Sequence, residues 1–233
     1  MQIIEKSALG VRTAIYKLVS RTRASEITVF PMIHVGEPRF YRQVKDRLSD
    51  MDLILFEGVS GETACRISQA YSLFPDKNRN GLIVQPKLNP DHFAGELIHA
   101  DIDGEAFEKE WEKLPWKLRL LLNIISPFYG IYTRYFVDSR AYYETAGLEL
   151  LSDRDDIFAS EDLLLLDDLM LVKRDKLLIK KLDKLIETHA YESVKIAVVF
   201  GAAHMRAVLR HLVKKLDFFV AESEWMTIVD WYE

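Results

Sequence analysis

The sequence predicts an α/β protein with a mostly parallel, open sheet flanked by helices and a large helical insertion. Three apolar runs predict strands that are buried on both faces, because Val, Ile, Leu and Phe follow one another instead of alternating with polar residues. These runs are EITVFPMIHV (26–35), DLILFEG (52–58) and KIAVVFGAAH (195–204). Two weaker strands are predicted at 96–103 and 217–223. Strands separated by helical segments are typical of right-handed crossovers in a parallel sheet.

Two helices are predicted next to these strands, because apolar residues recur there at helical spacing. The first lies in PRFYRQVKDRL, and Pro38 suits its first turn. The second follows His204. The two apolar stripes consist of Phe40, Tyr41, Val44 and Leu48, and of Met205, Val208, Leu209, Leu212 and Leu216.

The stretch from about 105 to 191 is predicted to be almost entirely helical, as an insertion into a single α/β domain of residues 1–233. Its most apolar part, residues 118–137, contains Arg119 and Arg134. These charges make it too polar for a spanning helix, which needs about 20 predominantly apolar residues. We expect two helical pieces there, bent around Pro127 and Gly130.

Composition excludes several classes of protein. The net charge of −5 and the absence of an Arg/Lys stripe with interleaved aromatic residues argue against nucleic-acid binding. The single cysteine, Cys65, excludes an intrachain disulfide and a zinc site built from cysteines of this chain. The N-terminus lacks the basic-then-apolar order of a signal peptide, so the sequence predicts a cytoplasmic protein.

Each strong strand candidate ends on a polar side chain: His34, Glu57 and His204. The weaker fourth candidate ends at Asp101 and Asp103. Because the carboxyl ends of parallel strands meet in one crevice, these residues are expected to lie close together. Two imidazoles and a carboxylate suit a divalent transition metal such as zinc, cobalt or manganese, and three protein ligands leave a position open for water. Water activated in this way is a hydrolytic nucleophile.

Each of these residues also has a structural interpretation. A histidine at a strand end is commonly a hydrogen-bonded structural residue, whereas a carboxylate such as Glu57, directly after LILF, needs a partner when it is buried. The small residues of 201–203 are expected to leave space beside the backbone, and His204 at a helix start is expected to be neutral. Further candidates for the site are Glu37, Arg39, Asp101 and Asp103.

The ordered set of motifs resembles the TraB/PrgY/GumN group, which includes the Tiki proteases and is distantly similar to erythromycin esterases. GAAH at 201–204 matches the group's glycine-x-x-histidine motif, and LFEG places Glu57 in the role of its glutamate. In the first motif, PMIH, Pro31 replaces the usual glycine. SDRDDIFA (152–159) resembles an arginine-containing motif of the group, which implies an active-site position for Arg154. The resemblance implies a metal-dependent hydrolase with manganese or cobalt.

The leading hypothesis is therefore a metal-dependent hydrolase, peptidase-like or esterase-like, with manganese, cobalt or zinc on His34, Glu57 and His204. Arg154 would stabilise an anionic intermediate. Its structural interpretation is a surface ion pair with a neighbouring aspartate. In a variant of this scheme Glu57 is a general base and the metal is held by the two histidines and an aspartate. The alternatives are a protein that binds a peptide or small ligand without turnover, and an interaction protein whose aromatic helical part contacts a partner or a membrane. Homo-oligomer formation is left open.

Overall fold

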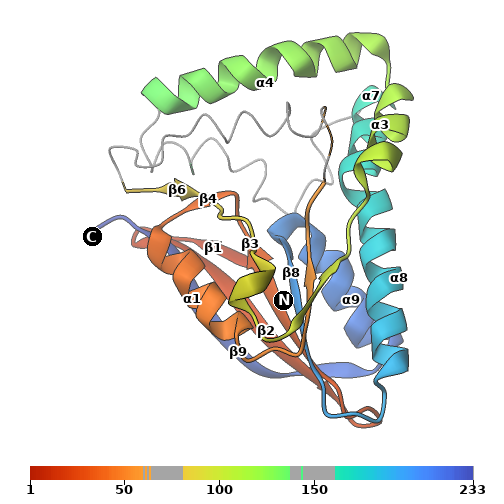
Figure 1. Cartoon of the computed structure of the whole chain (residues 1–233). Helices are drawn as coiled ribbons and strands as arrows, with labels where there is room; N and C mark the ends of the chain where they lie inside the picture. The colour runs from red at the N-terminus through yellow and green to blue at the C-terminus, as the bar shows by residue number, and fades with distance from the viewer. Residues whose placement is uncertain (60, 62, 64–80, 137–142, 144–160, 233) are drawn as a thin grey trace.

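The computed structural model describes residues 1–59, 61, 63, 81–136, 143 and 161–232. It is an α/β fold with a mixed seven-stranded sheet in the order β1-β2-β3-β8-β5-β7, and β9 pairs with β2 (Figure 1). The strands β3, β8, β5 and β7 are mutually parallel. Their bounds are Glu26–Met32 for β3, Lys195–Gly201 for β8, Leu53–Phe56 for β5 and Glu96–His99 for β7. The predicted fold class is confirmed.

The sheet extends beyond β3 through antiparallel strands that the sequence analysis did not predict in full. These are β1 (Ile4–Lys6), β2 (Gly10–Ser20) and β9 (Phe218–Asp230). β9 pairs with β2 along its whole length, from Gly10 opposite Asp230 to Ser20 opposite Phe218. β9 therefore continues well past the predicted strand at 217–223, because its long partner provides backbone hydrogen bonds for the additional residues.

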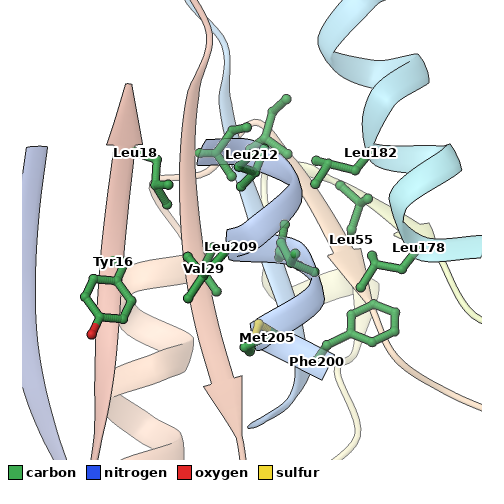
Figure 2. Packing of buried hydrophobic residues seen from close by; sticks show 14 of the residues in the cluster. Tyr16, Leu18, Val29, Leu55, Leu178, Leu182, Phe200, Met205, Leu209 and Leu212 are labelled. Atoms are coloured by element: carbon green, nitrogen blue, oxygen red, sulfur yellow. The ribbon is translucent and has the colours of Figure 1, made fainter. Parts of the chain in front are cut away.

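Both faces of the parallel strands are buried, as their continuous apolar sequences predict. In β8, Ala197 and Val199 belong to a core cluster with α1 (Pro38–Leu48). The alternate residues Ile196, Val198 and Phe200 belong to a second cluster, with α8 (Lys173–Thr188) and α9 (Met205–Lys215). Figure 2 shows this second cluster, in which Leu178, Leu182, Leu209 and Leu212 of the helices meet Val29 and Leu55 of the sheet. The sheet is thus the middle layer of three.

The helical stripes of α1 and α9 lie where the sequence predicts them. The buried residues of α1 are Phe40, Tyr41, Val44 and Leu48, and those of α9 are Met205, Val208, Leu209 and Leu212. Two smaller features lie outside the seven-stranded sheet. β4 (Val35–Gly36) and β6 (Ile83–Val84) form a separate antiparallel pair, and η1 (Pro90–His92) is a single 3₁₀ turn.

A group of helices occupies the chain between β7 and β8. It contains α3 (Gly104–Glu112), α4 (Trp116–Phe136), α7 (Glu161–Asp167) and the π-helical turn η2 (Asp168–Val172), which runs directly into α8. A third core cluster joins these helices and consists of Ile102, Phe107, Trp111, Leu114 and Leu169. In the part of the chain that the structure describes, no helix is both long and apolar enough to span a bilayer.

The expected division of the apolar segment into two helices is wrong. α4 is one helix of 21 residues that continues through positions 127 and 130. A proline inside a helix removes one backbone hydrogen bond, whereas a helix of this length has many others, so the loss of one need not end it.

Gly10 provides a test of the contact between β2 and β9. Its φ of 155° and the close approach of β9 exclude a side chain, because a Cβ atom would lie 2.1 Å from the carbonyl oxygen of Val229. We expect Gly10→Ala to lower the free energy of unfolding by about 2 to 4 kcal/mol, since both backbone strain and overpacking contribute. Urea denaturation measures this change.

Gly81→Ala is the matched control. Gly81 also has a positive φ, 73°, but a Cβ atom there would have nothing within 4 Å. Gly81→Ala is expected to lower the free energy of unfolding by only about 1 kcal/mol, because backbone strain contributes there and overpacking does not. Equal losses for the two variants would show that the close approach of Val229 contributes nothing.

Candidate active site

The order of the parallel strands brings the predicted site residues to one edge of the sheet. Glu57 directly follows β5, and its N–H donates to the carbonyl of Val199 in β8 at 3.1 Å. His204 ends the short turn η3 (Ala202–His204) that follows β8. Nε2 of His204 lies 3.7 Å from Oε1 of Glu57. The two residues are 147 positions apart in the chain, and adjacent strand ends account for their proximity.

His34 lies in the segment between β3 and β4. Its side chain is exposed, and its carbonyl accepts a hydrogen bond of 2.8 Å from the N–H of Gln85. The positive charge of its imidazolium form contributes to a lower pKa of Glu57. His34 is therefore within electrostatic range of Glu57, on a more exposed part of the same edge.

Arg174 connects the ends of β5 and β7. It is the second residue of α8, and its side chain is buried. Nε and Nη2 donate to the two carboxylate oxygens of Asp101 at 2.8 and 2.6 Å, and Nη2 also donates to Oε1 of Glu57. Nη1 donates to the carbonyl of Met170 in the π-helical turn at 3.2 Å. One guanidinium thus fixes two carboxylates from different strands.

Asp101 is held from its other side by the backbone. Its Oδ1 accepts from the N–H of Ile102 at 2.8 Å, and its Oδ2 accepts from the N–H of Gly58 at 3.2 Å. Gly58 follows Glu57 directly in the chain. Asp101 therefore fixes both the guanidinium of Arg174 and the backbone that carries Glu57.

Asp175, the neighbour of Arg174 in α8, orients His204. Its Oδ1 lies 2.7 Å from Nδ1 of His204. This contact leaves Nε2 as the nitrogen that faces Glu57. Two consecutive residues of one helix therefore hold the two central members of the site, Arg174 the glutamate and Asp175 the histidine.

Gly201 completes the surroundings of Glu57. Its N–H donates to Oε2 of Glu57, the oxygen that Arg174 does not contact. A Cβ atom at this position would lie 3.1 Å from Oε2 and 3.7 Å from Cδ2 of His204. The glycine at the end of β8 is thus explained by the space that the Glu57 carboxylate occupies.

The charges of the cluster shift the pKa values of its members. Burial disfavours the ionised form of Glu57, but the close approach of His204 and the charges of Arg174 and His204 outweigh it and lower the pKa of Glu57 well below its usual range. Burial likewise disfavours the protonated form of His204. The hydrogen bond to Asp175 and the close, negatively charged carboxylate of Glu57 outweigh that penalty and raise the pKa of His204 to about 9.

The expectation that His204 is neutral is therefore wrong for the protein without metal. Two carboxylates next to the imidazole, those of Asp175 and Glu57, favour its protonated form. The pKa of Arg174 is raised as well, because the hydrogen bond and charge of Asp101 and the charge of Glu57 outweigh its burial.

The remaining sequence candidates divide into four groups. Asp101 belongs to the cluster, as the ion-pair partner of Arg174. Glu37 and Arg39 pair with each other and with Asp230 at the end of β9, so they connect α1 to the antiparallel part of the sheet. Asp103 caps α3 by accepting from the N–H of Ala106 at 2.8 Å. Arg154 lies outside the described residues.

Arg174 and Asp175 were not among the residues that the sequence analysis selected. A signal for Arg174 is nevertheless present, because it stands four positions before Leu178 on the stripe that continues with Leu182 and Ile186. A charged residue on the buried face of a helix requires a charged partner. That rule applied to the α8 sequence would have selected Arg174.

The donor types of the cluster, imidazole and carboxylate, are those that divalent transition metals bind. Within the described ranges, no group of three or more His, Cys, Asp and Glu residues is arranged to hold a metal ion. Two of the three expected donors, on Glu57 and His204, are nevertheless adjacent, and a carboxylate on the second nitrogen of a metal-bound histidine is the usual supporting contact. Formally, the carboxylates of Glu57, Asp101 and Asp175 against one guanidinium leave a charge of two minus when His204 is neutral.

Comparisons of the chain with protein-family models, with curated proteins and with solved structures give no match. The resemblance to the TraB/PrgY/GumN group remains a prediction from short motifs. What this site can do is therefore argued from its own geometry.

The raised pKa of His204 predicts how the stability of the metal-free protein depends on pH. A group whose pKa is higher in the folded state than its ordinary value of 6.5 stabilises the fold fully below that value. This contribution is lost as the pH rises from about 6.5 to about 9. We expect the free energy of unfolding, measured in chelator by urea denaturation, to fall across this window by roughly 1 to 3 kcal/mol.

His204→Gln is expected to remove most of this pH dependence, because its side chain does not titrate. The control is His211→Gln, which changes a histidine on the same helix whose Nε2 pairs with Asp183 at 2.6 Å. It should leave the wild-type pH dependence in place. An unchanged fall in the His204→Gln variant would show that the contacts with Asp175 and Glu57 do not stabilise a protonated His204.

Proposed function

We propose that this chain is a metal-dependent hydrolase that cleaves an amide or ester bond in a peptide or small molecule. The observation that carries the proposal is the buried cluster at the strand ends. It pairs an ionised glutamate with an oriented histidine and, with His204 neutral as a metal ligand must be, has a formal charge of two minus that one divalent cation would balance. The motifs at the strand ends and their resemblance to the TraB/PrgY/GumN group support the same class of enzyme, a metal-dependent hydrolase.

His34, Glu57 and His204 would hold the cation, which we expect to be manganese, cobalt or zinc. A cation bound there would supply a Lewis acid that polarises a carbonyl and makes water a stronger nucleophile. The protein contributes orientation and charge. Asp175 fixes which imidazole nitrogen of His204 faces the cation site, and Arg174 holds Glu57 in place.

The lowered pKa of Glu57 favours its role as a ligand over its role as a general base. A carboxylate with a strongly depressed pKa accepts a proton poorly near neutral pH. The variant scheme needs an aspartate ligand, but the side chain of Asp101 is fully buried, whereas that of Glu57 is 19% exposed and lies beside His204. We therefore favour His34, Glu57 and His204 as the ligand set.

Arg174 does not replace Arg154 as the group that contacts the substrate. Its side chain is buried and its nitrogen atoms already donate to Asp101, Glu57 and the carbonyl of Met170, so it acts as a positioning residue. We propose Arg154 as the stabiliser of the anionic intermediate, on the basis of the motif in SDRDDIFA. We also propose a cytoplasmic location.

Metal binding and turnover test the proposal together. Calorimetry with manganese, cobalt and zinc on the chelator-treated protein should show one tight site. His204→Ala and His34→Ala should each weaken binding by about 100-fold or more, because each removes a direct ligand and loss of a mere supporting contact already costs about 10- to 100-fold. The metal-loaded protein should cleave members of a mixed peptide and ester library, and both variants should lose this activity.

His211→Ala is the control, because its histidine is on α9 but pairs with Asp183. It should bind metal and cleave substrate as the wild type does. Equal metal stoichiometry and affinity in the wild type and His204→Ala would overturn the assigned site. Retention of library members without products would instead identify a binding protein, and would contradict the hydrolase.

A further inference from the structure

Helix α4 presents a continuous apolar stripe to solvent. Six large side chains spaced one, three or four positions apart are each between 48% and 67% exposed. We name them the α4 face: Trp116, Leu120, Leu121, Ile124, Ile125 and Phe128. Single exposed apolar residues are ordinary on a protein surface, but a contiguous group of this kind indicates an interaction surface.

The opposite side of α4 is packed against the protein. Leu118 is buried, and Leu122 is partly buried against the cluster that contains Phe107 and Trp111 of α3. One side of the helix is thus packed against the protein, and an apolar side faces outward. The α4 face is not required for the packing of the described helices.

The charges around the α4 face indicate what covers it. From Lys113 to Phe136 the sequence contains no Asp or Glu, although the chain as a whole has a net charge of −5. The cations at the start of this stretch are Lys113, which pairs with Glu110 of α3, and Lys117 and Arg119. Lys117 is exposed beside the α4 face, with its Nζ 6.0 Å from the ring centroid of Trp116. An apolar stripe with a local excess of cations is complementary to an anionic, apolar-cored surface.

We propose that the α4 face docks on an anionic lipid membrane, with the helix in the plane of the interface. Leu120, Leu121 and Ile124 would enter the boundary of the acyl chains, Trp116 suits the headgroup region, and Lys117 would meet lipid phosphate. A second copy of the chain fits this face less well, because a symmetric contact of two α4 helices offers these cations no carboxylate, since α4 contains no Asp or Glu. Docking of this kind does not require a spanning helix.

The position of α4 gives the docking a consequence for the candidate site. Figure 1 shows α4 across the end of the molecule toward which the parallel strands run. Glu57 and His204 lie at that end of β5 and β8. A membrane bound to the α4 face would therefore be next to the end of the protein that carries the site. The docking itself does not depend on hydrolysis.

Vesicle flotation tests the proposal with the full chain. The wild type is expected to float with vesicles of phosphatidylglycerol and phosphatidylcholine, and to bind phosphatidylcholine alone at least tenfold more weakly. Leu121→Glu combined with Ile125→Glu should lower binding by at least about tenfold, because it puts two carboxylates into the acyl boundary. Lys117→Glu should lower binding to the anionic vesicles by about tenfold. Higher salt should also weaken this binding, because it screens the charges.

Leu9→Glu is the matched control, since Leu9 is a similarly exposed leucine, 70% exposed, outside α4. It should float as the wild type does, and circular dichroism should show all variants folded. Absence of wild-type binding to anionic vesicles would overturn the proposal, as would equal binding of Leu9→Glu and the double variant. A solution mass of a dimer that the α4 substitutions dissociate, without vesicle binding, would assign the face to a second copy and also overturn it.

Discussion

The contacts of Arg174 with Glu57 and Asp101 are the interaction on which the candidate site depends. Without the guanidinium, two carboxylates would face each other at adjacent strand ends with little access to water, and at least one would take up a proton. With it, Glu57 stays ionised and is directed toward His204. The same side chain connects α8 to the ends of β5 and β7, so the position of this helix and the charge of the site are set together.

The polypeptide around this contact is arranged to leave room for it. The N–H of Gly201 donates to the Glu57 carboxylate, and the lack of a side chain at Gly201 leaves space for it. Asp175 contacts Nδ1 of His204. The π-helical turn η2 ends directly before α8 and supplies the carbonyl of Met170 to Arg174. Such turns are rare and frequently occur at functional sites, which agrees with the position of this one beside the cluster.

Much of the fold could be predicted from local sequence. The parallel strands followed from unbroken apolar runs, and α1 and α9 followed from apolar residues at helical spacing. β2 was missed because Arg12 and Lys17 interrupt its apolar residues, and its length depends on its pairing with β9. The strand-end rule placed Glu57 beside His204, but it could not show that Glu37 and Arg39 turn toward Asp230. Those contacts depend on β9, whose full extent was not evident from local pattern.

The role of α8 in the site required the three-dimensional structure. Arg174 and Asp175 look like ordinary members of a charged helix until Arg174 is placed on the stripe of Leu178, Leu182 and Ile186. A motif with a similar Arg-Asp pair, in SDRDDIFA, directed the sequence analysis to Arg154 instead. Short motifs do not record which side of a helix is buried, whereas periodicity does.

A double-mutant cycle between Arg174 and Asp101 tests the central claim most directly. Unfolding free energies would be measured for Arg174→Met, Asp101→Asn and the double variant, with Arg174→Met and Asp183→Asn as a cycle between residues nine positions apart on α8. Because the first pair is buried and hydrogen-bonded, we predict a coupling energy of at least about 2 kcal/mol for it and additivity for the second. Additivity of the first pair within about 0.5 kcal/mol would contradict the account.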